Sequence, residues 1–140
     1  MTITTTTVEQ TYAFAAKLAK KLKPGDIVTL KGDLGSGKTT FSQGLGKALG
    51  VKQPVTSPTF LVIKTYTLEN EAIKRLNHVD LYRIENEKEL KNLGLLELFA
   101  DPHAVTLIEW PEKMGAHLPT HVTALQFEYI DETTRKITQL

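Results

Sequence analysis

Residues 32–39 read Gly-Asp-Leu-Gly-Ser-Gly-Lys-Thr. They match the phosphate-binding loop pattern G-x-x-x-x-G-K-[ST] at every defined position. Before the loop, residues 26–31 form a short apolar run rich in β-branched side chains, and after it residues 40–49 have apolar side chains at helical spacing. A strand before the loop and a helix after it are the setting that this pattern requires. The segment therefore predicts a nucleotide-phosphate site rather than an ordinary glycine-rich turn.

The residue types of this loop explain how it would hold phosphate. Glycine allows backbone angles that other residues avoid, so successive amide N–H groups can turn toward phosphate oxygens. The helix after the loop adds the positive end of its dipole. Lys38 can reach the β- and γ-phosphates of a nucleoside triphosphate, and Thr39 can bind magnesium. The expected nucleotide-binding residues of the loop are Gly35, Ser36, Gly37, Lys38, Thr39 and Thr40.

Composition limits the class of protein. The chain has 140 residues, 17 basic and 16 acidic side chains, a formal net charge of +1 at pH 7 and no cysteine. This length suits a single domain over residues 1–140, and the balanced charge gives no global attraction for nucleic acid or acidic membranes. The absence of cysteine excludes disulfides and thiolate metal sites.

Neither a membrane segment nor a signal sequence is recognisable. No apolar stretch approaches ~18 residues, and the N-terminus has neither a basic region nor an apolar core. We therefore expect a cytoplasmic protein without membrane contact. The basic cluster Lys17, Lys20 and Lys21 could contact RNA, but a solvated helix face is the commoner explanation.

Hydrophobic spacing gives an outline of the fold. A helix is expected over residues 8–22, with Thr7 as its N-cap and Gln10 as the capping-box partner, after a frayed segment over residues 1–7. Further strands are expected over residues 60–66, 73–82, 105–110, 122–130 and 136–140, with a helix over 87–100 and loops over 53–59 and 111–118. Strands outnumber helices. We expect an α/β fold of the small P-loop NTPase type, with a mixed central sheet flanked by helices.

Hydrolysis of a nucleotide also needs metal ligands and a group that positions water. Glu109 and Asp80 each end an apolar strand, and magnesium takes only one or two carboxylates, so either residue could bind it. Each could instead be an ordinary strand-end carboxylate. Thr59 lies in a proline-flanked loop and could approach the γ-phosphate as switch-loop threonines do, or bond its own backbone in a turn.

Several segments together resemble the TsaE family, formerly YjeE, the bacterial ATPases of tRNA threonylcarbamoyladenosine synthesis. They are residues 32–41, residues 57–60 (Ser-Pro-Thr-Phe), residues 78–83 (His-Val-Asp-Leu-Tyr-Arg) and residues 108–112 (Ile-Glu-Trp-Pro-Glu). The resemblance implies that the protein binds ATP with magnesium, hydrolyses it slowly and acts on a complex of the partners TsaB and TsaD. It also implies that the protein is needed for the threonylcarbamoyl modification of adenosine 37 in tRNA but does not itself transfer the threonylcarbamoyl group. Contact with tRNA is then expected only through the complex.

The resemblance also implies roles for single residues. It assigns phosphate binding to Lys38, magnesium binding to Thr39 and Glu109, and support of the metal or of the attacking water to Asp80. Thr59 becomes the switch-like threonine.

Two weaker correspondences concern the ends of the chain. The family places a residue of its first helix near the base, which here is Gln10 or Thr11, and a late arginine near the nucleotide, which here is Arg135. The segment 133–136 lacks the glycine that often precedes this arginine. Arg135 could therefore be only a charge at a strand edge.

Other functional classes share such a loop. A small-molecule kinase usually needs an arginine-bearing lid, but the chain has only Arg75, Arg83 and Arg135 and little room for one. A nucleotide-sensing binding module with incidental hydrolysis is compatible with the sequence. A GTPase is disfavoured, because the Asn-Lys-x-Asp signature for guanine is missing and residues 77–80 have its spacing without the lysine.

Overall fold

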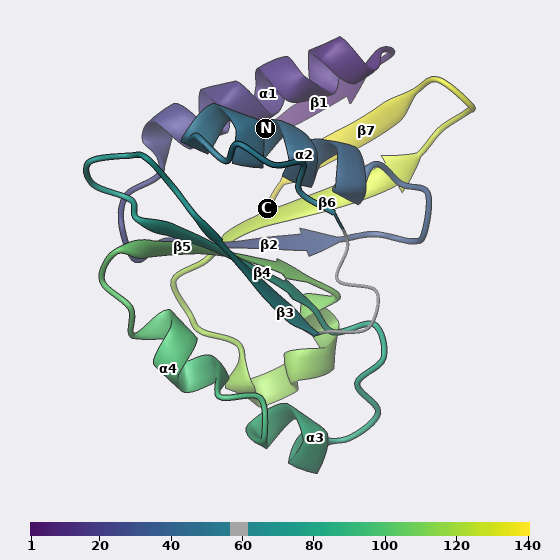
Figure 1. Cartoon of the computed structure of the whole chain (residues 1–140). Coiled ribbons are helices and arrows are strands. Elements are labelled where there is room, and N and C mark those ends of the chain that lie inside the picture. The colour runs from purple at the N-terminus through teal and green to yellow at the C-terminus, as the bar shows by residue number, and fades with distance from the viewer. Residues whose placement is uncertain (57–61) are drawn as a thin grey trace.

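A central β-sheet organises the computed structural model, which describes residues 1–56 and 62–140 (Figure 1). Its strands are β1 (Thr2–Thr5), β2 (Ile27–Lys31), β3 (Ile63–Thr67), β4 (Arg75–Asp80), β5 (Ala104–Glu109), β6 (Thr123–Tyr129) and β7 (Arg135–Gln139). Their order across the sheet is β1-β7-β6-β2-β5-β4-β3. Strand β2 runs parallel to β5 and β6, and β4 runs parallel to β5. The pairs β1–β7, β6–β7 and β3–β4 are antiparallel, so the sheet is mixed, as expected.

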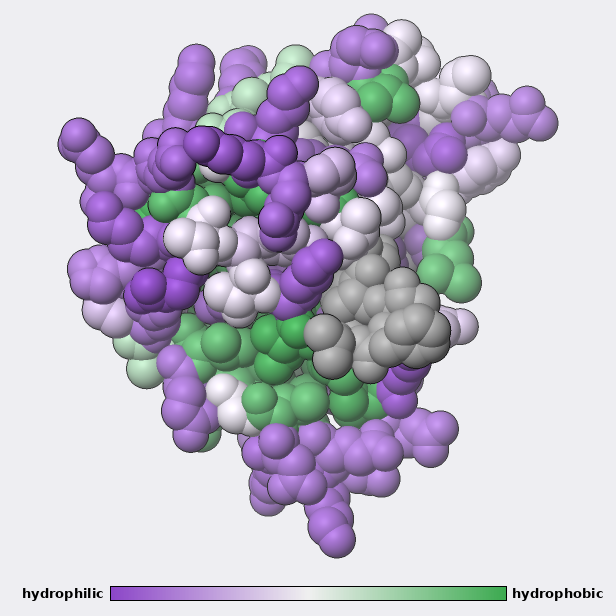
Figure 2. Space-filling model, in the orientation of Figure 1, coloured by the Kyte–Doolittle hydropathy of each residue, from purple (hydrophilic) through white to green (hydrophobic). Residues whose placement is uncertain are grey.

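Helices cover both faces of this sheet (Figure 1). Helices α1 (Val8–Lys21) and α2 (Lys38–Leu49) lie on one face, and the other face carries α3 (Glu87–Lys91), α4 (Leu95–Phe99) and the 3-10 segment η1 (Pro111–His117). Hydrophilic side chains dominate the outer side of α1 and α2, above a band of hydrophobic residues (Figure 2). None of the helices in the described part of the chain is long and apolar enough to cross a membrane.

The core has two parts because side chains alternate along each strand. Leu76 and Leu107 belong to the first cluster, together with Phe14, Phe41 and other buried residues of α1 and α2. Val79, three residues after Leu76, and Ile108, the residue after Leu107, point to the opposite face and belong to the second cluster, with Leu90 and Leu95 of the short helices. Residues of β4 and β5 that share a face with Leu76 and Leu107 therefore lie on the side of α2.

Close contact between the two long helices fixes the position of α2. A Cβ atom added to Gly44 would lie 2.7 Å from Cδ1 and 3.1 Å from Cα of Tyr12. Only glycine allows this approach of the two backbones. The close packing sets where the N-terminus of α2 lies, and the phosphate-binding loop leads directly into that end.

The N-terminus is ordered rather than frayed, which corrects the expectation for residues 1–7. Residues Thr2–Thr5 pair antiparallel with β7, and Ile3 packs against the first core cluster. Without β1, strand β7 would expose a row of unpaired backbone groups, and β1 satisfies them. The predicted N-cap is confirmed, because Thr7 Oγ1 accepts a hydrogen bond of 3.1 Å from the backbone N–H of Gln10.

Two further segments differ from the prediction. The expected helix over residues 87–100 is divided into α3 and α4, because Gly94 between them has a left-handed backbone with φ of 72°. The expected loop over residues 111–118 contains η1, which begins with Pro111 at the position where a missing N–H costs nothing.

Candidate functional site

The phosphate-binding loop has the predicted strand–loop–helix setting. It joins the carboxyl end of β2 to the N-terminus of α2, at the edge of the sheet where ligands of open α/β folds bind. Gly35 and Gly37 have φ of 80° and 105°, a region that favours glycine. A Cβ atom on Gly32 would lie 2.6 Å from the backbone oxygen of Phe127 in β6. The glycines therefore allow both the turn and its close approach to β6.

A cavity of about 710 Å³ opens beside this loop. Its volume lies in the range typical of small-molecule sites. Most of the site residues expected from the sequence line it, namely Thr11, Gly35, Gly37, Lys38, Thr39, Thr40, Asp80, Glu109 and Arg135. The structure thus brings together residues that are separated by most of the length of the chain.

Two of the expected residues that the structure describes, Ser36 and Gln10, do not line the cavity. Ser36 is buried, and its hydroxyl oxygen has no hydrogen-bond partner among the described residues. Gln10 directs its side-chain oxygen to the backbone N–H of Thr6, 2.7 Å away, because that oxygen completes the cap of α1. Thr59 lies outside the described residues.

The side chain of Lys38 lies at the centre of the site. Its ammonium donates a hydrogen bond of 2.5 Å to the carbonyl oxygen of Gly32 and lies 4.2 Å from the centroid of the Trp110 ring. Burial lowers the pKa of Lys38 below its ordinary value, whereas the nearby carboxylates of Glu109 and Asp80 act in the opposite direction. Lys38 therefore contacts the loop itself and faces a negatively charged wall of the cavity.

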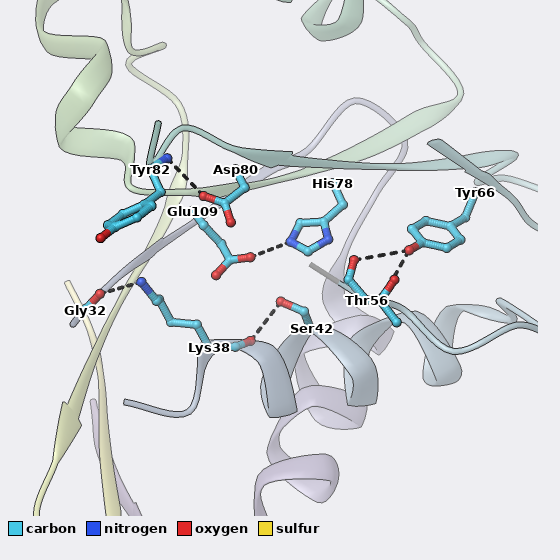
Figure 3. A network of polar contacts seen from close by, with 9 residues as sticks. All are labelled: Gly32, Lys38, Ser42, Thr56, Tyr66, His78, Asp80, Tyr82 and Glu109. Atoms are coloured by element: carbon cyan, nitrogen blue, oxygen red, sulfur yellow. Dashed lines mark hydrogen bonds and ion pairs between the residues drawn. The ribbon is translucent and has the colours of Figure 1, made fainter. Parts of the chain in front are cut away.

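That wall consists of Asp80 and Glu109, which are register partners at the ends of the parallel strands β4 and β5. Burial raises the pKa of Asp80, and Glu109 raises it further, while a 3.0 Å hydrogen bond from the backbone N–H of Tyr82 opposes the rise. Glu109 is almost fully buried, and its Oε2 lies 2.6 Å from Nε2 of His78 (Figure 3). These two carboxylates, at the carboxyl ends of neighbouring parallel strands, make this the most acidic part of the cavity lining.

The donor set is chemically suited to magnesium bound together with phosphate. In residues 1–56 and 62–140 no group of three or more His, Cys, Asp or Glu residues is arranged to hold a metal ion alone. Magnesium is usually held by one or two carboxylates plus substrate phosphates and water, so Asp80, Glu109 and the hydroxyl of Thr39 are the type of donors it requires. These residues fit the ion only in company with a phosphate ligand.

Residues from both ends of the chain close the remaining sides of the cavity. Thr11 Oγ1 donates a 2.9 Å hydrogen bond to Thr5 Oγ1, which links α1 to β1. Arg135 donates from Nε to the carbonyl oxygen of Gly35 at 3.0 Å and from Nη1 to the carbonyl oxygen of Asp131 at 2.6 Å. Because β7 lies between β1 and β6, Arg135 is not at an edge of the sheet.

Sequence reasoning missed several residues that line the cavity. Tyr82 is half exposed, and its ring centroid lies 5.2 Å from that of Trp110. The N-terminal threonines Thr5, Thr6 and Thr7 also line the site, although their sequence has no periodicity that would indicate it. Tyr82 could have been found, because it lies two residues after Asp80 in one of the motif segments.

Trp110, which follows Glu109 at the end of β5, contacts both the second core cluster and the site. Alternation from Glu109 predicts that the ring of Trp110 lies on the other side of the sheet, and the ring does pack against the second core cluster. However, the backbone of Trp110 is left-handed, with φ of 60°, and its ring also contacts Lys38. A left-handed backbone is uncommon for a residue other than glycine.

Comparisons with known proteins agree with this arrangement. A family model described as "Threonylcarbamoyl adenosine biosynthesis protein TsaE" matches residues 5–137. The chain is 42% identical to the "tRNA threonylcarbamoyladenosine biosynthesis protein TsaE" of Bacillus subtilis over 130 residues, which are 93% of this chain and 78% of that protein. It is 38% identical to the protein of the same name from a Nostoc species over 133 residues, 91% of this chain and 78% of the relative.

A solved structure agrees with the fold as well. The crystal structure of YdiB from Bacillus subtilis aligns with a TM-score of 0.78 and 35% sequence identity, and the alignment covers 99% of this chain and 83% of that chain. The matched segment includes the phosphate-binding loop, both carboxylates and Arg135. The chain therefore belongs to the TsaE family.

Proposed function

We propose that this protein binds ATP with magnesium, hydrolyses it slowly and is required for threonylcarbamoyl modification of adenosine 37 in tRNA. The observation that carries the proposal is the cavity in which the N-terminus of α2, Lys38 and two carboxylates converge. Membership of the TsaE family supports the role in tRNA modification. The protein would work in the cytoplasm, on a complex of TsaB and TsaD, and would meet tRNA only through that complex.

In the ATP-bound protein, Lys38 would leave the carbonyl oxygen of Gly32 and bind the β- and γ-phosphates. The amide groups of residues 35–40 would surround the phosphate oxygens. Thr39, Glu109 and Asp80 would hold magnesium, directly or through water. When bound, the ion would neutralise charge that develops on the phosphate oxygens during transfer.

The remaining members of the cavity lining would position the nucleotide. Thr11 of α1 lines the cavity on the side away from β4 and β5, which carry Asp80 and Glu109, and is a candidate for contact with the nucleoside. Arg135 already contacts the loop at Gly35, so it would hold the loop in shape while its charge faces the phosphates. Gln10 is a weaker candidate, because its side-chain oxygen caps α1.

A nucleotide-sensing module with incidental hydrolysis is the alternative, and it would use the same residues. The two functions differ in whether turnover responds to the partners. We expect slow Mg-dependent ATP turnover by the purified protein and faster turnover when TsaB and TsaD are added. If reconstituted threonylcarbamoylation of tRNA runs through repeated cycles equally well without this protein, the proposed role is wrong. If it requires the protein with ATP but proceeds without hydrolysis, the sensing module is correct.

A further inference from the structure

A buried histidine contacts one of the two carboxylates of the site. His78 lies in β4, two residues before Asp80, and only 1% of its surface is exposed. Its Nε2 atom lies 2.6 Å from Oε2 of Glu109 in the neighbouring strand (Figure 3). The two side chains share the face of the sheet that α2 covers, because His78 is the register partner of Leu107 in the first core cluster.

The surroundings of His78 determine which ring nitrogen carries the proton. Its Nδ1 atom is buried and has no hydrogen-bond partner among the described residues. A proton on Nδ1 would leave a buried donor unsatisfied and would place the bare Nε2 against an oxygen of Glu109, which is also an acceptor. The geometry therefore favours the tautomer in which the N–H group at Nε2 donates to Glu109.

The hydrogen bond from His78 restrains the carboxylate of Glu109, which has few other contacts among the described residues that would fix its orientation. No ion pair between Lys38 and Glu109 is found within 4 Å in the described part of the chain, and the only hydrogen bond found there to the carboxylate of Glu109 comes from His78. In Figure 3 this carboxylate lies between the ring of His78 and the side chain of Lys38. The bond uses Oε2, so Oε1 is the oxygen left for a ligand in the cavity that Glu109 lines.

We propose that His78 is a positioning residue for magnesium binding, which acts by orienting the carboxylate of Glu109. The inference rests on the proposed function, since it requires that Glu109 bind the ion. Groups that hydrogen-bond a metal ligand in this way typically contribute 10- to 100-fold to metal affinity or activity. A histidine that only fills the core would have no such effect on the metal.

Three substitutions separate orientation from packing. His78→Gln keeps an N–H donor that can reach Glu109, His78→Asn carries the same amide on a side chain that is one methylene shorter, and His78→Leu has no donor. His121→Gln is the control, because His121 is exposed. The measured quantities are the affinity for Mn²⁺ in the presence of a non-hydrolysable ATP analogue, followed by electron paramagnetic resonance, and the affinity for the analogue alone in EDTA.

We expect Asn and Leu to weaken Mn²⁺ binding by about 10- to 100-fold, Gln to remain close to the parent protein, and metal-free nucleotide affinity to be unchanged in all variants. The inference is overturned if Asn and Leu bind Mn²⁺ like the parent. It is also overturned if Gln is as weak as Leu while nucleotide affinity in EDTA falls with it, because that pattern indicates disrupted packing. A parent protein that binds nucleotide but no metal would instead refute the magnesium site of the proposed function, and the inference with it.

A measurement on the parent protein covers the case in which the variants do not fold. Nitrogen-15 NMR of labelled histidine distinguishes the two tautomers, and the exposed residues His103, His117 and His121 provide internal references. We expect the proton of His78 on Nε2. A neutral ring with its proton on Nδ1 alone would refute the proposed hydrogen bond without affecting the assignment of the phosphate-binding loop.

Discussion

Replacing Lys38 by alanine gives the sharpest test of the phosphate-binding loop. In the structure, the ammonium of Lys38 donates to the carbonyl oxygen of Gly32 at 2.5 Å. Binding ATP would exchange that bond for two bonds to phosphate oxygens. Hydrogen bonds to charged groups contribute about 1.5–3 kcal/mol each, so two new bonds less one lost bond leave a net gain of about 1.5–3 kcal/mol.

A second term adds to this loss. Once the ammonium is removed, magnesium alone offsets the repulsion between the phosphates and the carboxylates of Asp80 and Glu109, and a charge pair near a protein surface can cost a further ~1 kcal/mol or more. Each 1.4 kcal/mol is tenfold in affinity. We therefore expect Lys38→Ala to weaken ATP binding by at least about tenfold and up to roughly a thousandfold.

Calorimetry with magnesium and a non-hydrolysable ATP analogue measures this loss directly. Lys31→Ala is the matched control, because Lys31 is an exposed lysine one residue before the loop. Circular dichroism and thermal unfolding establish that both variants are folded. If folded Lys38→Ala binds the analogue as tightly as the parent and the control, the loop does not hold phosphate in the way described above.

Three further measurements test other parts of the molecule. Glu109→Ala and Asp80→Ala should reduce ATP turnover far more than nucleotide affinity, because metal and water placement matter most as charge develops in the transition state; turnover equal to that of the parent would remove both carboxylates from the mechanism. Intrinsic fluorescence of Trp110 should shift on addition of Mg-ATP, since its ring lies 4.2 Å from the ammonium that would move to the phosphates, and a flat titration at calorimetric saturation would exclude that coupling. Hydrogen bonds from Arg75 and from the backbone N–H of His103 lower the pKa of Asp101 to about 2 from an ordinary 3.8, so the ionised carboxylate stabilises the fold above pH ~4 and the effect is lost as the pH falls toward ~2. Arg75→Gln should therefore lower the free energy of unfolding measured by urea titration at pH 7, and an equal loss at pH ~2 would contradict this assignment.

Local patterns were sufficient to predict the centre of the site. The loop of residues 32–39 carries its own strand–loop–helix context, and a carboxylate that directly follows an apolar strand lies at a sheet edge wherever that strand is placed. Asp80 and Glu109 were therefore recognisable without knowledge of their neighbours. Their adjacency also requires the parallel pairing of β4 with β5, which the sequence does not specify.

The features that could not be predicted depend on distant partners. Strand β1 exists because β7, which follows more than a hundred residues later, offers a row of backbone groups to pair with. The bond between His78 and Glu109 depends on the register between two strands rather than on either segment. The split of the expected helix over residues 87–100 had a local signal in Gly94, but a glycine within a helical pattern is often tolerated.

The contacts around the loop indicate how nucleotide binding could reach the rest of the molecule. Arg135 joins the loop to the β6–β7 hairpin through Gly35, and a Cβ atom on Gly37 would lie only 3.3 Å from Cγ of Arg135. A Cβ atom on Gly32 would lie closer still to β6, at 2.6 Å from the backbone oxygen of Phe127. Because β1 pairs with β7, the hairpin also contacts the N-terminal strand. The hydrogen bond between Thr5 and Thr11 links that strand to α1. A change in the loop's shape on binding phosphate would therefore be resisted or transmitted by both ends of the chain, which together form the side of the cavity opposite Asp80 and Glu109.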